Sequence, residues 1–262
     1  MTDLDNLVFP SPSLKDRVVI VTGAGQGIGR VFAKAFGKAG ARAVIAEING
    51  AKAADVAAEI MDAGGAALAV TTDVADPTSI AQMAKAVADE YGRLDVLINN
   101  AAIFSMLSMR PFEQIPLEEW ERVLRVNLTG PMLCARAVLP AMKQAGWGRI
   151  INMGSGAVSL GRPGYLHYIA TKSALVGMSR SMARELGPDG ITVNTLLPGA
   201  TFTEIERETI TPEQKERIIG MQCVPRAETP EDLVGAALFL ASEASAFVTG
   251  QIVNADGGAT HP

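Results

Sequence analysis

The sequence predicts a single α/β domain of the doubly wound kind, in which helices cover both faces of a parallel sheet. Short runs of Val, Ile and Leu alternate with longer amphipathic segments along the whole chain. Such alternation is typical of parallel strands joined by helices. The 262 residues suffice for one large domain, and no linker or low-complexity tract divides them. The 26 glycines favour tight turns and close backbone packing.

The apolar runs predict seven strands in order along the chain. They are expected at residues 17–25, 42–48, 66–74, 94–102, 147–155, 190–199 and 250–258. These runs are rich in β-branched residues and lead into glycine or polar residues, as buried strands of a parallel sheet do at their turns.

Helical spacing fills the intervals between the strands. Helices are expected at residues 29–40, 51–65, 76–92, 116–146, 165–187 and 229–242. Glycines close the first two, and the third begins with Asp76 as N-cap and Pro77 in its first turn. The segment 116–146 is interpreted as one long helix that bends near Gly130 and Pro131.

Two segments depart from this alternation. Residues 1–14 contain two prolines and several polar side chains, and we expect them to form an arm outside the core. The domain proper is therefore expected to cover residues 15–262. The polar, charged segment 200–226 lies between the sixth strand and the next helix, and we interpret it as a substrate lid.

Composition argues against several classes of function. The net charge of −5 disfavours nucleic acid as a partner, because phosphate binding needs a basic face. The two cysteines, Cys134 and Cys223, match neither a metal-ligand spacing nor a disulfide framework, so no metal is expected. The N-terminus lacks the apolar stretch of a signal peptide, and no apolar run reaches the length of a membrane span. We expect a cytoplasmic protein with no membrane partner.

Three glycines after the first strand indicate a dinucleotide site. Gly23, Gly27 and Gly29 fit the pattern G-x-x-x-G-x-G. Glycine lets a pyrophosphate approach the backbone, and the helix N-terminus offers free N–H groups to it. The turn could instead serve packing alone, but its place after the first apolar strand favours a nucleotide. Candidate cofactor contacts in this turn are Gly23, Gln26, Gly27, Ile28 and Gly29.

An acid at the end of the second strand favours NAD over NADP. Glu47 would accept hydrogen bonds from the adenosine ribose hydroxyls and would repel a 2′-phosphate. No lysine or arginine flanks Gln26 in the glycine turn to attract that phosphate. Glu47 could also be a solvated acid without a ligand. Asp73 and Val74 end the third strand, where Asp73 could bond the adenine amino group or begin the turn before Asp76.

The stretch from Tyr165 to Lys172 indicates a proton-transfer group. Tyr168 and Lys172 are four residues apart on one helix, so their side chains share a face. A free tyrosine has a pKa of about 10, and a nearby ammonium lowers that pKa by favouring the phenolate. Tyr165 has Ile169 at the same offset and lacks such a cation. His167 points about 100° away from Tyr168 around the helix, so we expect it to be structural.

Two further polar residues stand where they could complete this group. Ser155 ends the fifth strand, at the carboxyl edge where ligands bind in open parallel sheets. Its hydroxyl could hold a substrate oxygen beside Tyr168, or it could belong only to a glycine-rich turn. Asn127 is an unfavourable residue inside the long helix. It could simply be tolerated there, or it could hold a water that relays protons to Lys172.

In this order, the motifs resemble those of the short-chain dehydrogenase/reductase family. Residues 22–29 match its glycine motif, and residues 99–102 match its NNAG motif except at Ala102. The family's catalytic tetrad is matched in order and spacing by Asn127, Ser155, Tyr168 and Lys172. Its nicotinamide-side loop is matched by Pro198, Gly199 and Thr203. The likeness runs from about residue 15 to residue 258.

The resemblance implies a Rossmann-like sheet of seven parallel strands, hydride transfer to or from a nicotinamide, and often a tetramer. Tyr168 would be the general acid in carbonyl reduction and the base in alcohol oxidation. Lys172 would lower the pKa of that tyrosine and hold the ribose, Ser155 would orient the substrate oxygen, and Asn127 would keep the proton relay in place. The further cofactor contacts implied are Asn100, Tyr168, Lys172, Pro198, Gly199 and Thr203.

The loops at the carboxyl ends of the strands indicate a neutral, apolar secondary alcohol or ketone as the substrate. Their side chains are mostly apolar, and Arg110 and Arg162 are the only cations found near them in the sequence. The candidate pocket residues are Ile103, Phe104, Met106, Leu107, Val158, Leu160, Phe202 and Met221.

Two other functions stay open at this point. A reductase of 3-oxoacyl groups on a carrier protein would need NADPH and a basic surface, which Glu47 and the net charge of −5 count against. A non-catalytic dinucleotide sensor would not need Ser155, Tyr168 and Lys172. The segments 116–145 and 165–186 carry apolar residues on more than one face, which favours a homo-oligomer and, within that, a tetramer.

Overall fold

The computed structural model describes residues 13–205 and 211–261. Its strands form one parallel sheet of seven, in the order β3-β2-β1-β4-β5-β6-β7. The strands are β1 (Val18–Thr22), β2 (Arg42–Glu47), β3 (Ala66–Thr71), β4 (Val96–Asn99), β5 (Gly148–Met153), β6 (Ile191–Pro198) and β7 (Ile252–Ala255). The order reverses between β1 and β4, which is the topological switch point where doubly wound sheets bind their ligands. The predicted fold class is confirmed.

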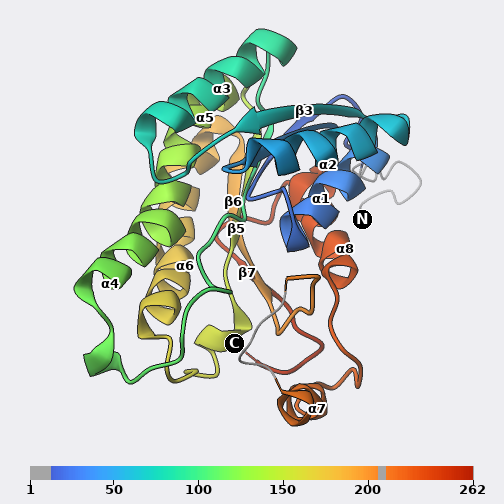
Figure 1. The fold of residues 1–262 in the computed structure, drawn as a ribbon. Helices are drawn as coiled ribbons and strands as arrows, with labels where there is room; N and C mark the ends of the chain where they lie inside the picture. Colours follow the sequence, from blue (N-terminus) through green and yellow to red (C-terminus); the bar gives the residue numbers. More distant parts are fainter. Residues whose placement is uncertain (1–12, 206–210, 262) are drawn as a thin grey trace, which may run out of the picture.

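Helices cover both faces of this sheet (Figure 1). One layer contains α1 (Gly27–Lys38), α2 (Gly50–Asp62) and α8 (Pro230–Ala241). The other contains α3 (Pro77–Tyr91), α4 (Leu117–Leu124), α5 (Gly130–Ala145) and α6 (Leu166–Leu186). Because all the strands are parallel, their carboxyl ends lie at the same edge of the sheet. The loops that follow the strands therefore gather at that edge.

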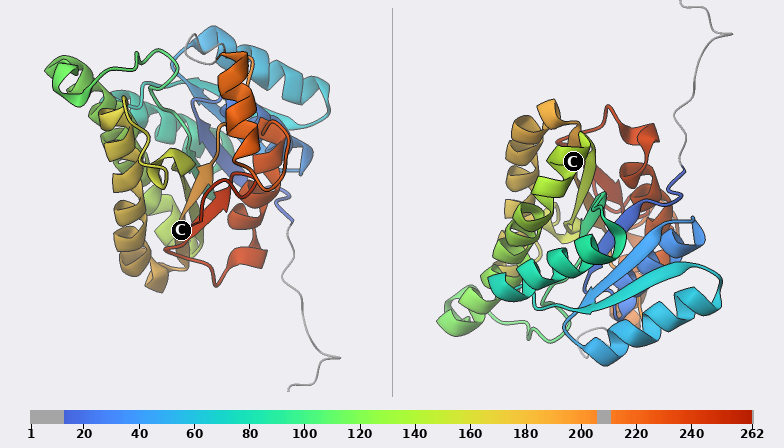
Figure 2. Two further views of the ribbon diagram at one scale, coloured as in Figure 1. Left: turned by 90° about the horizontal axis from the view of Figure 1, so that it is seen from below. Right: turned by 90° about the horizontal axis from the view of Figure 1, so that it is seen from above.

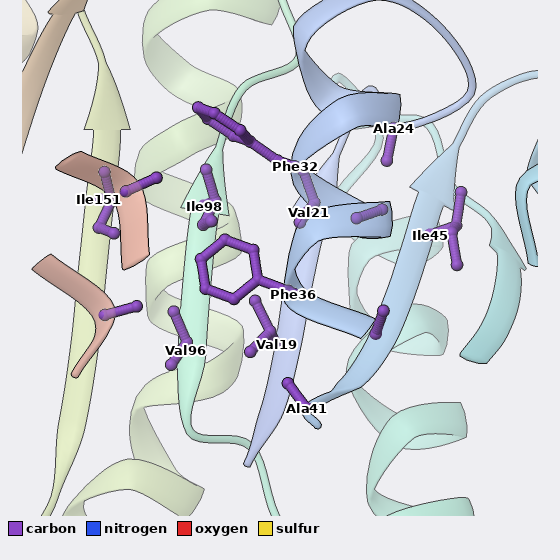
Figure 3. Close-up of a cluster of buried hydrophobic side chains, with 14 of the residues drawn as sticks. Val19, Val21, Ala24, Phe32, Phe36, Ala41, Ile45, Val96, Ile98 and Ile151 are labelled. Atoms are coloured by element: carbon purple, nitrogen blue, oxygen red, sulfur yellow. The ribbon is translucent and has the colours of Figure 1, made fainter. Parts of the chain in front are cut away.

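Aromatic side chains of α1 fasten the first layer to the sheet. Phe32 and Phe36 are one helical turn apart and share a face. Figure 3 shows both rings over the strands, among Val19, Val21 and Ile98. All five side chains are fully buried. Burying a phenylalanine contributes about 1.5–3 kcal/mol, so this contact fixes the helix whose N-terminus carries the glycine turn.

The core begins earlier in the chain than the sequence predicted. Leu14, assigned to an arm outside the core, is only 1% exposed and packs with the α1 layer. Burying a leucine side chain lowers the free energy of the fold, and this contact holds the chain in place just before β1. The arm boundary after residue 14 was therefore wrong, and residues 1–12 lie outside the part of the chain that is described.

The predicted long helix is not uniform. Residues 117–145 follow one helical path, but residues 125–129 between α4 and α5 are π-helical. Pro131 has no N–H, so the carbonyl of Asn127 lacks the donor that an α-helix would give it. The sequence had predicted a bend near Gly130. The backbone instead widens into the π-helical turn around Asn127. The wider turn buries Asn127 completely.

One helix was not predicted at all. Within the proposed lid, α7 (Pro212–Gly220) begins at a capping box formed by Thr211 and Gln214. It lies outside both layers at one end of the sheet in Figure 1, and the left view of Figure 2 looks onto it. Along residues 13–205 and 211–261, no helix combines the length and the apolarity that crossing a membrane requires.

Candidate active site

A cavity of about 950 Å³ opens at the carboxyl edge of the sheet and gathers most of the predicted site residues. Those that line it are Gly23, Gln26, Gly27, Ile28, Glu47, Asp73, Val74, Asn100, Ser155, Tyr168, Lys172, Pro198, Gly199 and Thr203. Asn127 and Gly29, which were also predicted, do not line it. Residues from six strand ends thus meet in one space large enough for a dinucleotide and a small substrate.

The glycine turn has two different tasks. At Gly23 φ is +64°, and a Cβ would lie 2.8 Å from the Ala101 Cα, so only glycine fits where the turn passes β4. At Gly29 a Cβ would lie 2.2 Å from the Gly23 carbonyl oxygen. Gly29 is therefore needed for packing the helix against the turn, rather than for contact with a cofactor. Asn100 holds the turn, because its Nδ2 donates to the carbonyls of Thr22 and Gly23 at 2.9 and 3.1 Å.

A carboxylate from the lid segment sits on the first amide of α1. The N–H of Gly27 donates to Glu204 Oε1 at 2.8 Å. A helix N-terminus binds anions through its free N–H groups and its positive dipole end. Glu204 thus marks the anion position that a pyrophosphate would use, and a pyrophosphate on this amide has to displace it. This contact joins residues 177 positions apart, and no local pattern predicts it.

The end of the cavity beside β2 is lined by an acid, and a cation lies close to it. Glu47 is 8% exposed, and its carboxylate accepts the N–H groups of Gly25 and Asn49 at 3.0 and 3.1 Å. Lys52, from α2, donates its ammonium to the Gln26 side-chain oxygen. The glycine turn itself contains no lysine or arginine, as the sequence showed, and the cation beside Gln26 comes from α2, which folds back onto the turn.

Asp73 forms the turn that was one of its two predicted roles. Its Oδ1 accepts the N–H of Ala75 at 2.8 Å, and its own N–H donates to Ser79 Oγ at 2.9 Å. The same residue lines the cavity next to Val74. The turn therefore holds Asp73 at the edge of the cavity, where its contact with an adenine stays a prediction.

The lysine of the predicted proton-transfer group is buried, and among the described residues no carboxylate forms an ion pair with it. Lys172 is 4% exposed, and its Nζ donates to the Met153 carbonyl at 2.6 Å. Burial lowers the pKa of this ammonium from its ordinary 10.5 to about 8. Its Nζ lies 5.6 Å from the centre of the Tyr168 ring. A positive charge therefore stands close to the tyrosine at neutral pH.

The two tyrosines of this stretch face different surroundings. Tyr168 lines the cavity, with its ring centre 4.3 Å from that of Phe104. Tyr165 is 2% exposed, packs 5.4 Å from the same phenylalanine and does not line the cavity. Only Tyr168 can meet a substrate in this space.

Ser155 stands directly after β5 on the cavity wall. Its side chain caps a short 3₁₀ turn by accepting the N–H of Ala157 at 3.3 Å, so the turn role suggested by the sequence is present. It is 8% exposed. A hydroxyl retains donor capacity after accepting this bond, and it can hold a substrate oxygen in the same cavity as Tyr168.

Asn127 acts on the loop after β4. Its Oδ1 accepts the Ile103 N–H at 2.7 Å, and its Nδ2 donates to the Ile103 carbonyl at 3.0 Å. The amide is fully buried. The π-helical turn therefore ties the loop that carries Phe104 to α4, and a role of Asn127 in a proton relay stays a prediction.

A buried acid that the sequence analysis missed supports the loop after β6. Glu228 is 4% exposed and accepts the Gly199 N–H at 3.1 Å and the Thr201 hydroxyl at 2.6 Å. Burial raises the pKa of this carboxyl, while both hydrogen bonds oppose the rise. Glu228 thereby holds the turn at Pro198 and Gly199 in place. The two segments are distant in the sequence and meet only in the folded chain.

The outer cavity wall is mainly apolar but contains more cations than predicted. Of the candidate pocket residues, those that line it are Ile103, Phe104, Met106, Leu160 and Met221. Those that do not are Leu107, Val158 and Phe202. Arg122, Arg125, Arg162 and Arg217 also line it. Arg110 lies elsewhere and faces Glu119 at 3.6 Å.

His167 is consistent with its predicted structural role. It is fully buried, and its Nε2 lies 3.2 Å from Glu119 Oε1 on α4. It does not line the cavity. The contact links α6, which carries Tyr168, to α4, which precedes Asn127 in the chain.

Comparison with known proteins decides the family. A family model described as Enoyl-(Acyl carrier protein) reductase matches residues 23–260. The chain is a short-chain dehydrogenase/reductase. The resemblance drawn from the sequence motifs is confirmed, and with it the assignment as an oxidoreductase.

Similar members of this short-chain dehydrogenase/reductase family differ in substrate and cofactor. Galactitol 2-dehydrogenase of Agrobacterium fabrum is 40% identical over 256 residues, covering 94% of this chain and 98% of the relative. A crystal structure of a protein proposed to be an NAD(P)-dependent gluconate 5-dehydrogenase of Beutenbergia cavernae, with NADP at low occupancy, is 38% identical with a TM-score of 0.88, over 94% and 98% of the chains. The 3-ketoacyl-(acyl-carrier-protein) reductase of Brucella melitensis, complexed with NADH, is 34% identical with a TM-score of 0.86, over 95% and 100%.

Proposed function

We propose that this enzyme is an NAD-dependent oxidoreductase acting on a neutral secondary alcohol or its ketone. The observation that carries the proposal is that Ser155, Tyr168 and the buried ammonium of Lys172 line one cavity with the glycine turn. A sensor would have no use for a desolvated cation beside a tyrosine, because burying such a charge costs stability. The apolar side chains of the outer wall favour an uncharged substrate, whereas the four arginines that share this wall would suit an acidic one.

The residues present fit a nicotinamide dinucleotide. Gly27 offers the amide that Glu204 now occupies, and Glu47, which lines the cavity, would meet the ribose. Pro198 and Gly199 would hold the nicotinamide side. When bound, the dinucleotide supplies a ring that accepts or donates a hydride.

The side chains of the protein would bind the substrate oxygen and transfer its proton. Ser155 donates a hydrogen bond to the substrate oxygen and orients it. Tyr168 removes the hydroxyl proton in oxidation and returns it in reduction. Lys172 favours the phenolate form through its charge and is held in place by Met153. Asn127 positions the adjoining loop through Ile103.

A screen of alcohols and ketones with NAD(H) and NADP(H) tests this function. NADH absorbance should change with at least one secondary alcohol or ketone. Binding of NADH, seen by its fluorescence, without any turnover across the panel would instead favour the sensor.

We expect NAD to be preferred over NADP. A 2′-phosphate would stand near the Glu47 carboxylate, while Lys52 offers partial compensation. The ratio of kcat/KM for the two cofactors measures the preference, and we expect about tenfold in favour of NAD, the effect of about 1.4 kcal/mol. Glu47→Ala should narrow it, and the matched Lys52→Ala should widen it. Equal or better use of NADP by the parent enzyme would contradict the preference.

Reduction of 3-oxoacyl groups is the second candidate function. It is favoured by the similarity to the Brucella melitensis reductase and by exposed apolar side chains at the cavity, Met106, Met109 and Leu160, that could contact an acyl chain. A 3-oxoacyl thioester offered with NADPH in the same screen tests it. Turnover faster than with every simple ketone would favour this function over the first.

We also infer a homo-oligomer, a tetramer rather than a dimer. Of the apolar residues on which this was predicted, Val138, Met142 and Leu175 are buried within the chain and carry no such argument. Met132 on α5 and Leu166 on α6 are 39% and 45% exposed, and a partner could cover them. Light scattering should give a multiple of the 27.4 kDa chain mass, whereas a single-chain mass at micromolar concentration would reject the inference.

A further inference from the structure

One buried polar atom on the cavity wall has no partner within the described residues. Gln222 is 8% exposed and lines the cavity, and its Oε1 is shielded from solvent and accepts no hydrogen bond there. A buried acceptor without a donor is unfavourable, so such an atom points to a group that binds it. Gln222 follows α7, in the segment that the sequence analysis interpreted as a substrate lid.

The side chain of Gln222 is fixed against the turn after β7. A Cβ at Gly257 would lie 3.4 Å from the Cβ and Cδ of Gln222 and 3.5 Å from its Cγ, so the glutamine packs flat on this glycine. The backbone N–H of Val224 also donates to the Gly257 carbonyl at 2.9 Å. The amide is therefore held at the wall before any ligand arrives, which lowers the entropy lost on binding.

This wall is polar and reaches the reacting end of the cavity. Asp256, 3% exposed, accepts the Thr260 hydroxyl at 2.6 Å, and both residues line the cavity beside Gln222. The position of a Cβ on Gly156, the residue after Ser155, lies 3.4 Å from Asp256 Oδ2. We call Gln222, Asp256 and Thr260 the polar wall. It continues the surface that carries Ser155.

The polar wall selects the chemistry of the substrate. The free Gln222 oxygen needs a donor, which an alkyl chain cannot supply. A carboxylate is also unsuited, because it brings no donor and meets the charge of Asp256. A hydroxyl group donates one hydrogen bond and accepts others, and it is uncharged. The wall thus complements hydroxyl groups, in contrast to the apolar outer rim.

We propose that the substrate is polyhydroxylated, and that a hydroxyl other than the reacting one donates to Gln222 Oε1 after the amide turns about its Cγ–Cδ bond and brings this atom to the cavity surface. This inference rests on the proposed function for the reaction at Ser155 and Tyr168. It replaces the apolar substrate expected from the sequence with a polyol or its hydroxyketone. No covalent step involves the polar wall, which binds and selects.

A comparison of substrates and variants tests the role of Gln222. Threitol and galactitol are compared with butan-2-ol and hexan-2-ol of equal chain length. The parent enzyme should have the higher kcat/KM for the polyols. Gln222→Met keeps the side-chain length and removes the acceptor, and it should lower kcat/KM for the polyols by about 10- to 100-fold, with little change for the simple alcohols. An equal loss for both substrate classes, or no loss for the polyols, would overturn the proposal.

Gln214→Met is the matched control. Gln214 comes from α7 and also lines the cavity, but its Oε1 already accepts the Thr211 N–H at 3.1 Å. It should not change the ratio of polyol to simple-alcohol turnover. Calorimetric titration of threitol and galactitol into each protein with NADH gives a readout independent of turnover. Polyol binding that Gln222→Met weakens, without turnover in the parent, would reject the proposed function alone; polyol binding that the substitution leaves unchanged would reject the role of Gln222.

Discussion

Tyr168→Phe should lower kcat for alcohol oxidation by about 10²–10⁴-fold, the usual contribution of general acid–base catalysis, and coupling to Ser155 and Lys172 would enlarge the loss. The substitution removes one hydroxyl and keeps the ring that packs on Phe104 at 4.3 Å. The cavity shape should therefore survive. What is lost is the group that takes the proton from the substrate.

The structure supplies a matched control on the same helix. Tyr165→Phe removes the hydroxyl of the other tyrosine, which packs on the same phenylalanine but does not line the cavity. We expect this variant to keep most of its activity. Any general effect of altering the aromatic cluster should appear in both variants, whereas loss of the proton acceptor should appear only in Tyr168→Phe.

Two measurements separate chemistry from binding. NADH fluorescence titration should give similar dissociation constants for the parent and for both tyrosine variants, because the glycine turn and Glu47 are untouched. kcat should fall only for Tyr168→Phe. Near-parental turnover by Tyr168→Phe would exclude the proposed proton transfer, and a parallel loss in Tyr165→Phe would show that packing is responsible.

The sequence was informative wherever chemistry is encoded by local spacing. Alternating apolar runs predicted all seven strands, and the offset between Tyr168 and Lys172 placed both on one face of α6. These patterns need no knowledge of distant contacts. The glycine turn could also be predicted locally, because the sequence alone shows a buried strand followed by glycines and the N-terminus of a helix.

The sequence was uninformative wherever the site depends on contacts between distant segments. Glu204 reaches Gly27, Lys52 reaches Gln26, and Glu228 reaches Gly199 only because the chain folds back on itself. None of these acids and cations is distinguishable from a surface charge by spacing alone.

The π-helical turn at Asn127 was missed for a related reason. The proline at 131 was noticed as a helix irregularity, but its effect falls four residues earlier, on the carbonyl that loses its donor. The missed helix α7 is short and polar, and its nine residues show too weak an apolar period to stand out.

Lys172→Met should abolish most activity and yet stabilise the protein at neutral pH. The drop in the Lys172 pKa from 10.5 to about 8 corresponds to about 3 kcal/mol of cost in keeping the buried ammonium charged. Methionine fits a similar space without that cost. It also removes the hydrogen bond to the Met153 carbonyl, worth about 1 kcal/mol. The net gain at pH 7 should be about 2 kcal/mol in the free energy of unfolding.

The pH dependence identifies the source of this gain. The folded pKa of Lys172 lies below the unfolded one, so below pH 8 the parent carries the full cost of the charge. Between pH 8 and 10.5 the folded chain binds fewer protons than the unfolded chain, so the contribution of this group to stability rises with pH. The advantage of Lys172→Met should therefore shrink across this window and, above it, give way to a deficit of about 1 kcal/mol, the value of the lost hydrogen bond. Denaturant unfolding of both proteins at pH 7 and pH 10 measures the difference.

The same substitution should damage function in two separable ways. Without the ammonium near Tyr168, the rise of kcat for alcohol oxidation with pH should move to higher pH, because the phenolate is no longer favoured. NADH binding should weaken as well, if Lys172 holds the ribose. We expect kcat at pH 7 to fall by about 10²–10⁴-fold. A variant that is less stable than the parent at pH 7, or whose stability difference from the parent is the same at pH 10, would show that the charge of Lys172 is compensated in the fold. A stable variant with unchanged kcat would exclude Lys172 from the mechanism. The expected combination, more stable and nearly inactive, would mean that the fold tolerates an unfavourable buried charge because the proton transfer requires it.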